Sequence, residues 1–216
     1  MLARRKDRLD ELRAELGKGS FAVSADVTDL DALESAIGLA SHALGGLDGV
    51  IAVAGRAMVG SVATGTPQRW RELIDLNLIG PLATVRYAIG YFPNNGRRDV
   101  VLIGSAAALM SQPGVGIYSA SKRGLRAAFE SLRLELAPSG VNVSIVMPGM
   151  FETEGLTLEG IVIDGEVPAN DFPFLVPGCV PPPPGPLADT IAFMIGQPEG
   201  YCIGELVARP TGQLTP

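Results

Sequence analysis

Apolar runs alternate with helical stretches along this chain, and this alternation constrains the fold more than any other sequence feature. Residues 47–55, 99–105 and 141–146 have the pattern of strands that are buried on both faces of a parallel sheet. The helical stretches 66–91 and 118–136 separate these strands. The sequence therefore predicts an α/β fold with a Rossmann-like, doubly wound parallel sheet and right-handed crossovers.

The rest of the chain mostly continues this alternation. Within 66–91, Thr66 caps the helix, Pro67 starts it, and Pro81 is expected to kink it. The other predicted elements are helix 4–16, strand 21–27, a helix capped by Thr28 or Asp29, helix 187–195 and strand 205–208. No repeat interrupts this order, so we expect a single domain over 1–216.

The pattern fades between residues 155 and 186, where the sequence is acidic and proline-rich. Four consecutive prolines at 181–184 favour an extended polyproline conformation. Because ordered long loops in compact domains are often lids, we expect 155–186 to form a substrate-loop excursion over the active site. The alternative is a loop that does not contact the substrate.

Composition excludes several classes of function. A net charge of −6 argues against a nucleic-acid partner, which would need a basic surface. The two cysteines, Cys179 and Cys202, lack metal-ligand spacing, so we expect no metal site and a reducing, cytoplasmic location. No signal peptide or membrane segment is predicted. His42, the only histidine, has no nearby acid or nucleophile, which argues against a histidine-based triad.

Tyr118 and Lys122 lie four residues apart in a predicted helix, so both side chains should lie on one face. A phenol with its usual pKa is a poor acid or base at neutral pH. An ammonium close to it favours the phenolate and lowers the pKa of the phenol towards the working range. This pair is therefore a candidate for proton transfer, although the spacing alone occurs often by chance.

The surrounding motifs make the pair more specific. Asn77 precedes it in the helix 66–91, Ser105 ends a strand, and Pro148-Gly149 ends the next strand with Thr153 beyond it. In this order and at these spacings the chain resembles the classical short-chain dehydrogenase/reductase family over residues 4–213. The resemblance implies that Tyr118 exchanges the proton with the substrate oxygen and that Ser105 hydrogen-bonds that oxygen. It also implies that Lys122 contacts the nicotinamide ribose and that Asn77 holds a water of the proton relay.

The same resemblance implies a cofactor site. Asp26 would lie at the adenine edge, Val27 against the adenine face, and Ala54-Gly55 beside the ribose and phosphates. Arg4 and Arg5 follow the predicted second strand of the family, where an arginine accommodates a 2′-phosphate, so NADP is favoured over NAD. A solvated helix start is the alternative for these two arginines. The other cofactor-binding residues that the family implies are Tyr118, Lys122, Pro148, Gly149 and Thr153.

The chain departs from the family pattern at its start, because the family's glycine-rich phosphate loop comes before the segment that matches this chain. We therefore expect an N-terminally truncated sheet that lacks the first strand and helix, with roughly 30 to 40 residues preceding Met1 in the natural protein. Strand 21–27 would then lose its neighbours, and strand 47–53 would expose an apolar edge. The run Ala52-Val53-Ala54-Gly55 also lacks the asparagine that the family usually has before Ala-Gly.

Three hypotheses for function follow. The first is an NAD(P)(H)-dependent oxidoreductase that interconverts a carbonyl and an alcohol. The second is a cofactor-independent isomerase, cyclase or dehydratase that uses the same tyrosine and lysine. The third is an inactive truncated or partner subunit. A homodimer or homotetramer through the two long helices is expected from the resemblance. Phe151, Phe172, Phe174 and Leu175 indicate either a hydrophobic substrate or a cover for the core.

Overall fold

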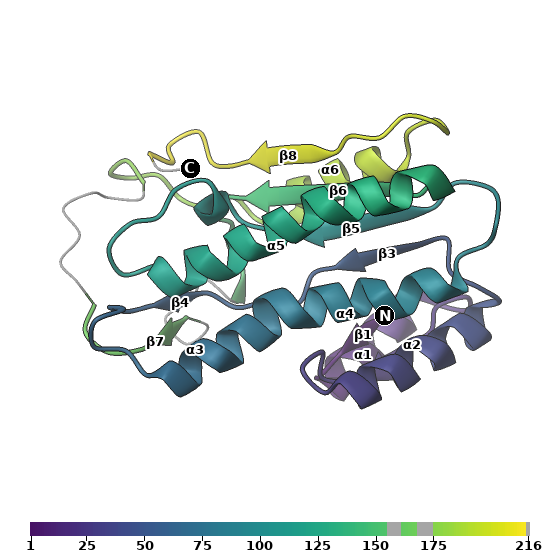
Figure 1. Cartoon of the computed structure of the whole chain (residues 1–216), viewed down its shortest axis with the longest axis horizontal. Helices are drawn as coiled ribbons and strands as arrows, with labels where there is room; N and C mark the ends of the chain where they lie inside the picture. The colour runs from purple at the N-terminus through teal and green to yellow at the C-terminus, as the bar shows by residue number, and fades with distance from the viewer. Residues whose placement is uncertain (155–160, 168–174, 215–216) are drawn as a thin grey trace.

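A four-stranded parallel sheet forms the centre of the molecule in the computed structural model, which describes residues 1–154, 161–167 and 175–214 (Figure 1). The strand order is β3 (Gly49–Ala52), β5 (Asp99–Ile103), β6 (Asn142–Pro148) and β8 (Glu205–Ala208). All three neighbouring pairs are parallel. The predicted α/β fold with a parallel sheet is therefore confirmed.

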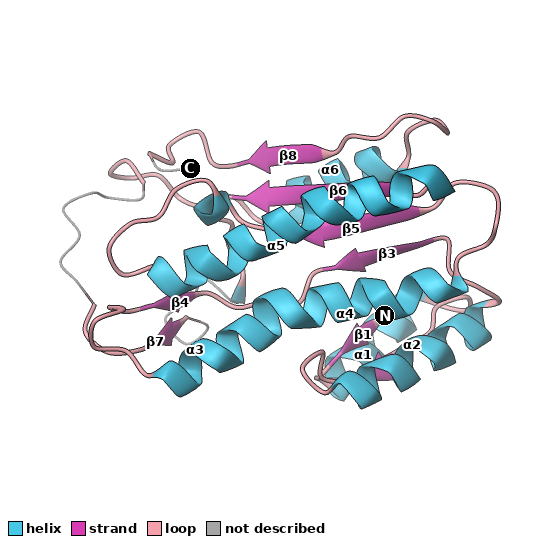
Figure 2. Cartoon of the chain, viewed as in Figure 1, coloured by secondary structure: helices cyan, strands magenta, loops and turns pink. Residues whose placement is uncertain are grey.

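Helices cover both faces of this sheet (Figure 2). Helices α4 (Gly80–Ala88) and α5 (Gly116–Leu136) pack on one face and α6 (Gly185–Ile195) on the other. The remaining helices are α1 (Lys6–Leu16), α2 (Leu30–Leu44) and α3 (Pro67–Ile74). Alternate residues of β5 explain the two layers: Val100 and Leu102 pack in the core with α4 and α5, whereas Val101 packs with Met194 of α6. Both faces of β5 are therefore buried, as its apolar run predicts.

A second parallel pair joins β1 (Leu2–Ala3) and β2 (Val23–Ser24), with Leu2 opposite Val23. The expectation that strand 21–27 would lose its neighbours is thus wrong. That strand is also shorter than predicted, in keeping with a partner strand of only two residues. The expectation that strand 47–53 exposes an apolar edge holds. Among the described residues β3 pairs only with β5, and Ile51 is 44% and Val53 63% exposed.

The long helix predicted over 66–91 is broken before Pro81. A π-helical turn, Asp75–Ile79, separates α3 from α4, and the Gly80 N–H donates to the carbonyl of Asp75. Pro81 has no N–H to donate to the carbonyl of Asn77, four residues earlier, so a regular α-helix cannot continue there. The predicted irregularity therefore lies one turn earlier, as a π-helical turn that contains Asn77.

A short parallel pair that the sequence did not predict joins β4 (Met58–Val59) and β7 (Val162–Ile163). It lies at one end of the molecule, next to α3 (Figure 1). The segment 161–167 belongs to the excursion predicted over 155–186. The flanking segments 155–160 and 168–174, with Phe172 and Phe174, lie outside the described residues. Residues 185 and 186 belong to α6.

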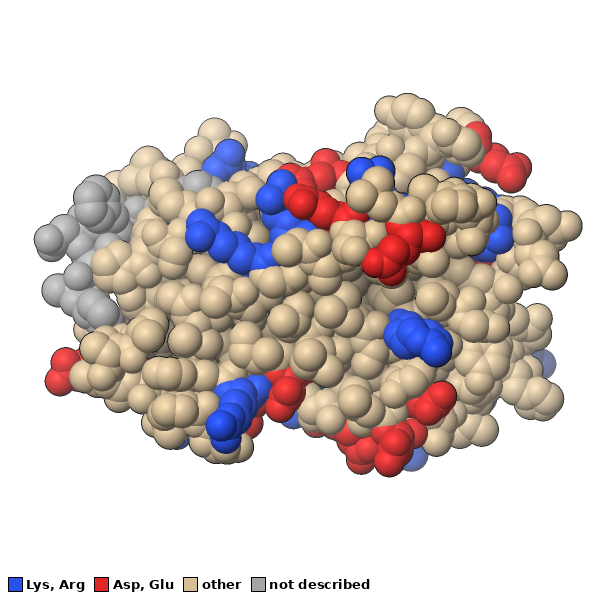
Figure 3. Space-filling model, viewed as in Figure 1, with Lys and Arg blue, Asp and Glu red and all other residues tan. Residues whose placement is uncertain are grey.

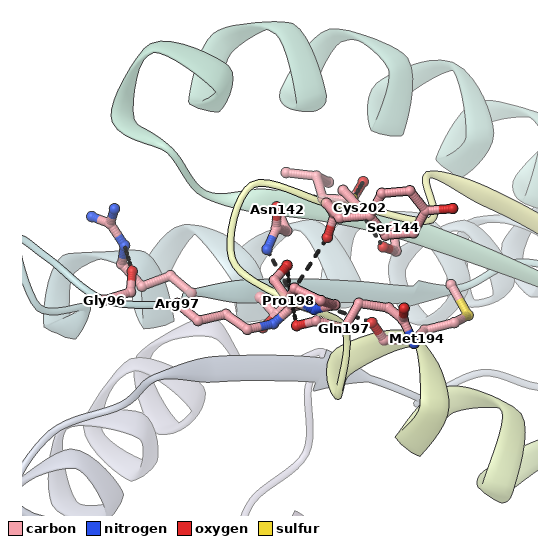
Figure 4. Close-up of polar contacts among 12 residues, drawn as sticks. Gly96, Arg97, Asn142, Ser144, Met194, Gln197, Pro198 and Cys202 are labelled. Carbon is pink, nitrogen blue, oxygen red and sulfur yellow. Dashed lines mark hydrogen bonds and ion pairs between the residues drawn. The ribbon is translucent and has the colours of Figure 1, made fainter.

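Arg97 anchors the end of α6 to the start of β5 (Figure 4). Its guanidinium forms an ion pair with Asp99 at 2.7 Å and donates to the carbonyls of Met194 at 3.2 Å and Pro198 at 3.0 Å. Asn142 of β6 donates to Asp99 at 3.2 Å. One arginine thus satisfies carbonyls at and beyond the C-terminus of a helix, which are otherwise left without partners.

No helix in the described part of the chain combines the length and the hydropathy that crossing a membrane requires. Within the same residues, no cluster of histidine, cysteine, aspartate or glutamate side chains could hold a metal ion.

Candidate active site

The predicted site residues follow the carboxyl ends of the parallel strands. Ser105 follows β5, Pro148 ends β6, Ala54-Gly55 follows β3, and Arg4 and Asp26 follow β1 and β2. In open α/β sheets, ligands bind outside the carboxyl ends of the strands. Sequence order and sheet topology together therefore bring these residues to one edge of the molecule.

Ser105 and Tyr118 form the polar centre of this edge. Ser105 is 9% exposed, and its hydroxyl oxygen accepts a hydrogen bond from the Ala107 N–H at 3.2 Å. Tyr118, in the first turn of α5, lies close to Ser105. Burial raises the pKa of the Tyr118 phenol, and the nearby Ser105 hydroxyl offsets part of that rise. The predicted lowering of the Tyr118 pKa by Lys122 is therefore not found in this structure.

Lys122 lies one helical turn after Tyr118 and is 4% exposed. Its ammonium donates to the carbonyl of Ile103 at 3.0 Å, two residues before Ser105. Burial lowers the pKa of Lys122 to about 8, because the charged form loses its hydration. A Cβ atom at Gly55 would lie 3.2 Å from the Lys122 Nζ atom, so the small residue after β3 leaves room for the ammonium.

Asn77 is fully buried and holds the chain that follows β3. Its Oδ1 accepts from the Arg56 N–H at 2.8 Å, and its Nδ2 donates to the Arg56 carbonyl at 2.9 Å. Nδ2 also lies 3.2 Å from the Ser121 hydroxyl oxygen. The side chain is thus committed to structure. A water of the predicted relay would therefore bind the backbone carbonyl of Asn77. Pro81, four residues later, has no N–H to donate to that carbonyl.

Two cavities open at this edge. An apolar cavity of about 270 Å³ is reached by Ser105 and Tyr118, and Pro148 and Gly149 also line it. Its other walls include Met58, Met110, Met150 and Ile161. A polar cavity of about 520 Å³ is lined by Arg4, Asp26, Thr28, Arg56, Arg69 and Glu72. Met58 lines both cavities, so they are neighbours.

The structure separates the predicted cofactor residues into two groups. Arg4 lies in the polar cavity, with its guanidinium 3.6 Å from the Asp26 carboxylate. Arg5 instead pairs with Glu154 at 2.7 Å and lines neither cavity. Val27 packs in the core with Leu33 and Ile37, and Thr153 is exposed.

Sequence reasoning missed the methionine walls and the pairing of β4 with β7, whereas Ile161 lies within the excursion predicted over 155–186. Methionines are common in cores, so Met58, Met110 and Met150 carry no distinctive signal when they are far apart in sequence. The pairing of Met58 with Val162 joins residues that are far apart in sequence, and no local pattern predicts it. The glycines Gly60 and Gly65 were an available signal, because glycine permits close approach of two chain segments.

A family model described as short chain dehydrogenase matches residues 1–159. Curated relatives extend the likeness. Glycine betaine reductase of Emericella nidulans is 31% identical over 213 residues, which is 96% of this chain and 16% of that protein. The (-)-trans-carveol dehydrogenase of Rhodococcus erythropolis is 36% identical over 159 residues, 71% of this chain and 57% of that protein. The chain thus spans less than two thirds of the length of either relative.

Solved structures have the same fold. The alcohol dehydrogenase of the archaeon Thermococcus sibiricus, complexed with 5-hydroxy-NADP, superposes with a TM-score of 0.82 at 22% identity. The match covers 98% of this chain and 85% of that one. At this identity the likeness shows the fold alone.

Proposed function

Because the chain belongs to the short-chain dehydrogenase family, we propose that it is an NADP(H)-dependent oxidoreductase that interconverts a carbonyl and an alcohol. One observation carries this proposal: Ser105 and Tyr118 lie close together and both line an apolar cavity. Two hydroxyl groups that converge on one point can bind the single oxygen of a carbonyl or alcohol, while the apolar walls accept the hydrocarbon part.

We propose that the two cavities together receive a dinucleotide. The polar cavity lies beside the apolar one, so a single molecule with a charged end and a reactive ring could occupy both. Arg4 and Arg56 would hold phosphate groups, Asp26 the adenine end, and Lys122 the ribose nearest the reacting ring. Arg4 in the polar cavity supports NADP over NAD. When bound, the cofactor supplies or accepts the hydride.

Each side chain then has a separate task. Tyr118, whose phenol is neutral at pH 7, gives its proton to the substrate oxygen as the carbonyl is reduced. Ser105 fixes the position of that oxygen by a hydrogen bond. Lys122 is mostly charged at pH 7 with a pKa of about 8, so its ammonium is available to hold the cofactor ribose. Asn77 holds the turn after β3 and so keeps Gly55 against the lysine.

The test is NADPH oxidation with a panel of uncharged ketones, followed at neutral pH. Replacing Tyr118 with Phe removes the hydroxyl and keeps the ring, so we expect kcat to fall by about a thousandfold or more, with an unchanged far-ultraviolet circular dichroism spectrum. Replacing the exposed Tyr91 with Phe is the matched control and should leave kcat unchanged. Equal turnover by the Tyr118→Phe variant contradicts the assignment. Substrate consumption without NADPH oxidation would instead indicate a cofactor-independent isomerase, cyclase or dehydratase.

We also propose self-association through α4 and α5. The groove between these helices, of about 450 Å³, is lined by Leu82, Val85, Ile89 and Leu132. Figure 3 shows few charged side chains along the middle of this face.

The scarcity of cysteine supports a reducing, cytoplasmic compartment.

A further inference from the structure

A strap, defined as residues 161–167, crosses the loop that follows β4. The Val162 N–H donates to the Ala57 carbonyl at 3.1 Å and the Asp164 N–H to the Val59 carbonyl at 3.0 Å. The Ser61 N–H donates to the Glu166 carbonyl at 2.8 Å, which continues the same ladder. About one hundred residues of sequence separate the two segments, so they meet only in the folded protein.

Asp164 fastens the strap to the start of α3. It is 4% exposed, and its Oδ2 accepts hydrogen bonds from the Thr66 N–H at 2.8 Å and from the Trp70 indole N–H at 3.1 Å. Thr66 is the N-cap of α3 but makes no side-chain cap bond of its own. The carboxylate of Asp164 therefore satisfies a donor at the helix start, where a negative charge is also favoured by the helix dipole. Arg69 adds a bond to the Ile163 carbonyl at 2.9 Å.

Three glycines permit this crossing. A Cβ atom at Gly60 would lie 1.8 Å from the Asp164 carbonyl oxygen, and one at Gly65 would lie 2.8 Å from the Asp164 Oδ2 atom. Gly165 has a φ of 74°, and a Cβ there would meet Thr64 at 2.8 Å. Any larger residue at Gly60 or Gly65 would force the strap away from the loop. The close approach is therefore encoded on both sides of the contact.

The strap forms walls of both cavities. Ile161 lines the apolar cavity beside Ser105 and Tyr118, whereas Val162 and Ile163 line the polar cavity. Met58, the strand partner of Val162, lines both. The position of a strand pair that is two residues long thus fixes how close Ile161 comes to the reacting groups.

We propose that Asp164 is a positioning residue that holds the strap in place and thereby limits the size of the substrate that reaches Ser105 and Tyr118. This inference rests on the proposed oxidoreductase function for its kinetic consequence only. We expect the fixed strap to favour compact, uncharged ketones, because the described cavity walls are mostly apolar and Ile161 forms one of them. Loosening the strap moves this wall without touching the catalytic groups, so it changes selectivity between small and bulky substrates.

The first test does not need turnover. Hydrogen exchange of the strap amides, measured by mass spectrometry, should accelerate at least tenfold in the Asp164→Ala and Gly60→Ala variants. It should not change in Gly90→Ala, where a Cβ meets open space, nor in β8 of any variant. Trp70 is the only tryptophan, so its fluorescence should shift in the Asp164→Ala variant as the indole loses its partner. Unchanged strap exchange in the Asp164→Ala variant overturns the proposal.

The second test compares kcat/KM for cyclohexanone and for 4-tert-butylcyclohexanone with NADPH. In the Asp164→Ala variant we expect the ratio to shift about tenfold towards the bulky ketone, with kcat for cyclohexanone within about threefold of the wild type. Asp164→Asn, which keeps an acceptor oxygen, and Trp70→Phe, which removes one donor, should shift the ratio less and in the same direction. A loss of folded protein lowers both values equally and leaves the ratio unchanged.

The two proposals can fail separately. A ratio that stays within about twofold while strap exchange accelerates overturns the positioning role of Asp164 and leaves the oxidoreductase function standing. Absence of NADPH oxidation by the wild type with every ketone overturns the proposed function, and strap exchange then still decides whether Asp164 holds the strap.

Discussion

The buried ammonium of Lys122 links the candidate site to the pH dependence of folding stability. Its pKa is lowered from 10.5 to about 8 in the folded protein, whereas the unfolded chain keeps the ordinary value. Between pH 8 and pH 10 the unfolded state therefore binds more protons, and the free energy of unfolding rises with pH. We expect urea denaturation to give a rise roughly 2 to 3 kcal/mol larger in the wild type than in Lys122→Met. Parallel pH profiles for the two proteins would rule out this interpretation.

For single residues, the sequence predicted which side chains lie at the site better than it predicted their pKa values. The order of Asn77, Ser105, Tyr118 and Lys122 predicted side chains that the fold indeed brings to one edge of the molecule, and their roles stay predictions. The pKa of Tyr118 went the other way, because burial outweighs any effect of the lysine and burial cannot be read from a spacing. Arg5 could not be placed either, since its partner Glu154 lies far along the chain.

At the scale of elements, Arg97 holds α6 against the sheet. Its side chain is 20% and that of Asp99 15% exposed, and the pair is completed by carbonyls at and beyond the end of α6. Replacing Arg97 with Ala leaves these acceptors and the carboxylate without their donor. We expect the free energy of unfolding to fall by about 2 to 3 kcal/mol, measured by urea denaturation. Arg98→Ala, which loses only bonds to nearby loop carbonyls, is the control and should cost less than about 1 kcal/mol.

Helices and long strands were predicted well because their signals are local. The predicted strand 205–208 has the bounds of β8, and Asp29 caps α2 by accepting from the Ala32 N–H at 3.1 Å. The strand pair β4 and β7 was missed because two-residue strands carry no periodicity and their pairing depends on contacts across the whole chain. The π-helical turn at Asp75–Ile79 was displaced from the predicted kink for a comparable reason: proline marks an irregularity without fixing which turn absorbs it.

For the whole molecule, the order of apolar runs predicted the parallel sheet, and the family resemblance predicted the exposed edge of β3. The sequence did not predict that β1 and β2 pair with each other, because a two-residue strand at Leu2–Ala3 has no periodic pattern of its own. The carboxyl ends of β1 and β2 lead to the polar cavity through Arg4 and Asp26, and Arg56, which precedes β4, lines the same cavity. The location of the site therefore depends on topology, while its shape depends on contacts that only the folded chain makes.

Self-association is the prediction that belongs to the molecule as a unit. The groove between α4 and α5 is lined by the half-buried Leu82, Ile89 and Leu132, and burying them against a second copy would remove apolar surface from water. Ser131 is exposed and lines this groove, so Ser131→Arg places a charge in the interface without disturbing the core. We expect size-exclusion chromatography with light scattering to give a dimer or tetramer for the wild type and a smaller species for this variant. Ala14→Arg, on the exposed face of α1, should leave the mass unchanged. A wild type that is monomeric at micromolar concentration, or a Ser131→Arg variant of unchanged mass, would show that this face is not the interface.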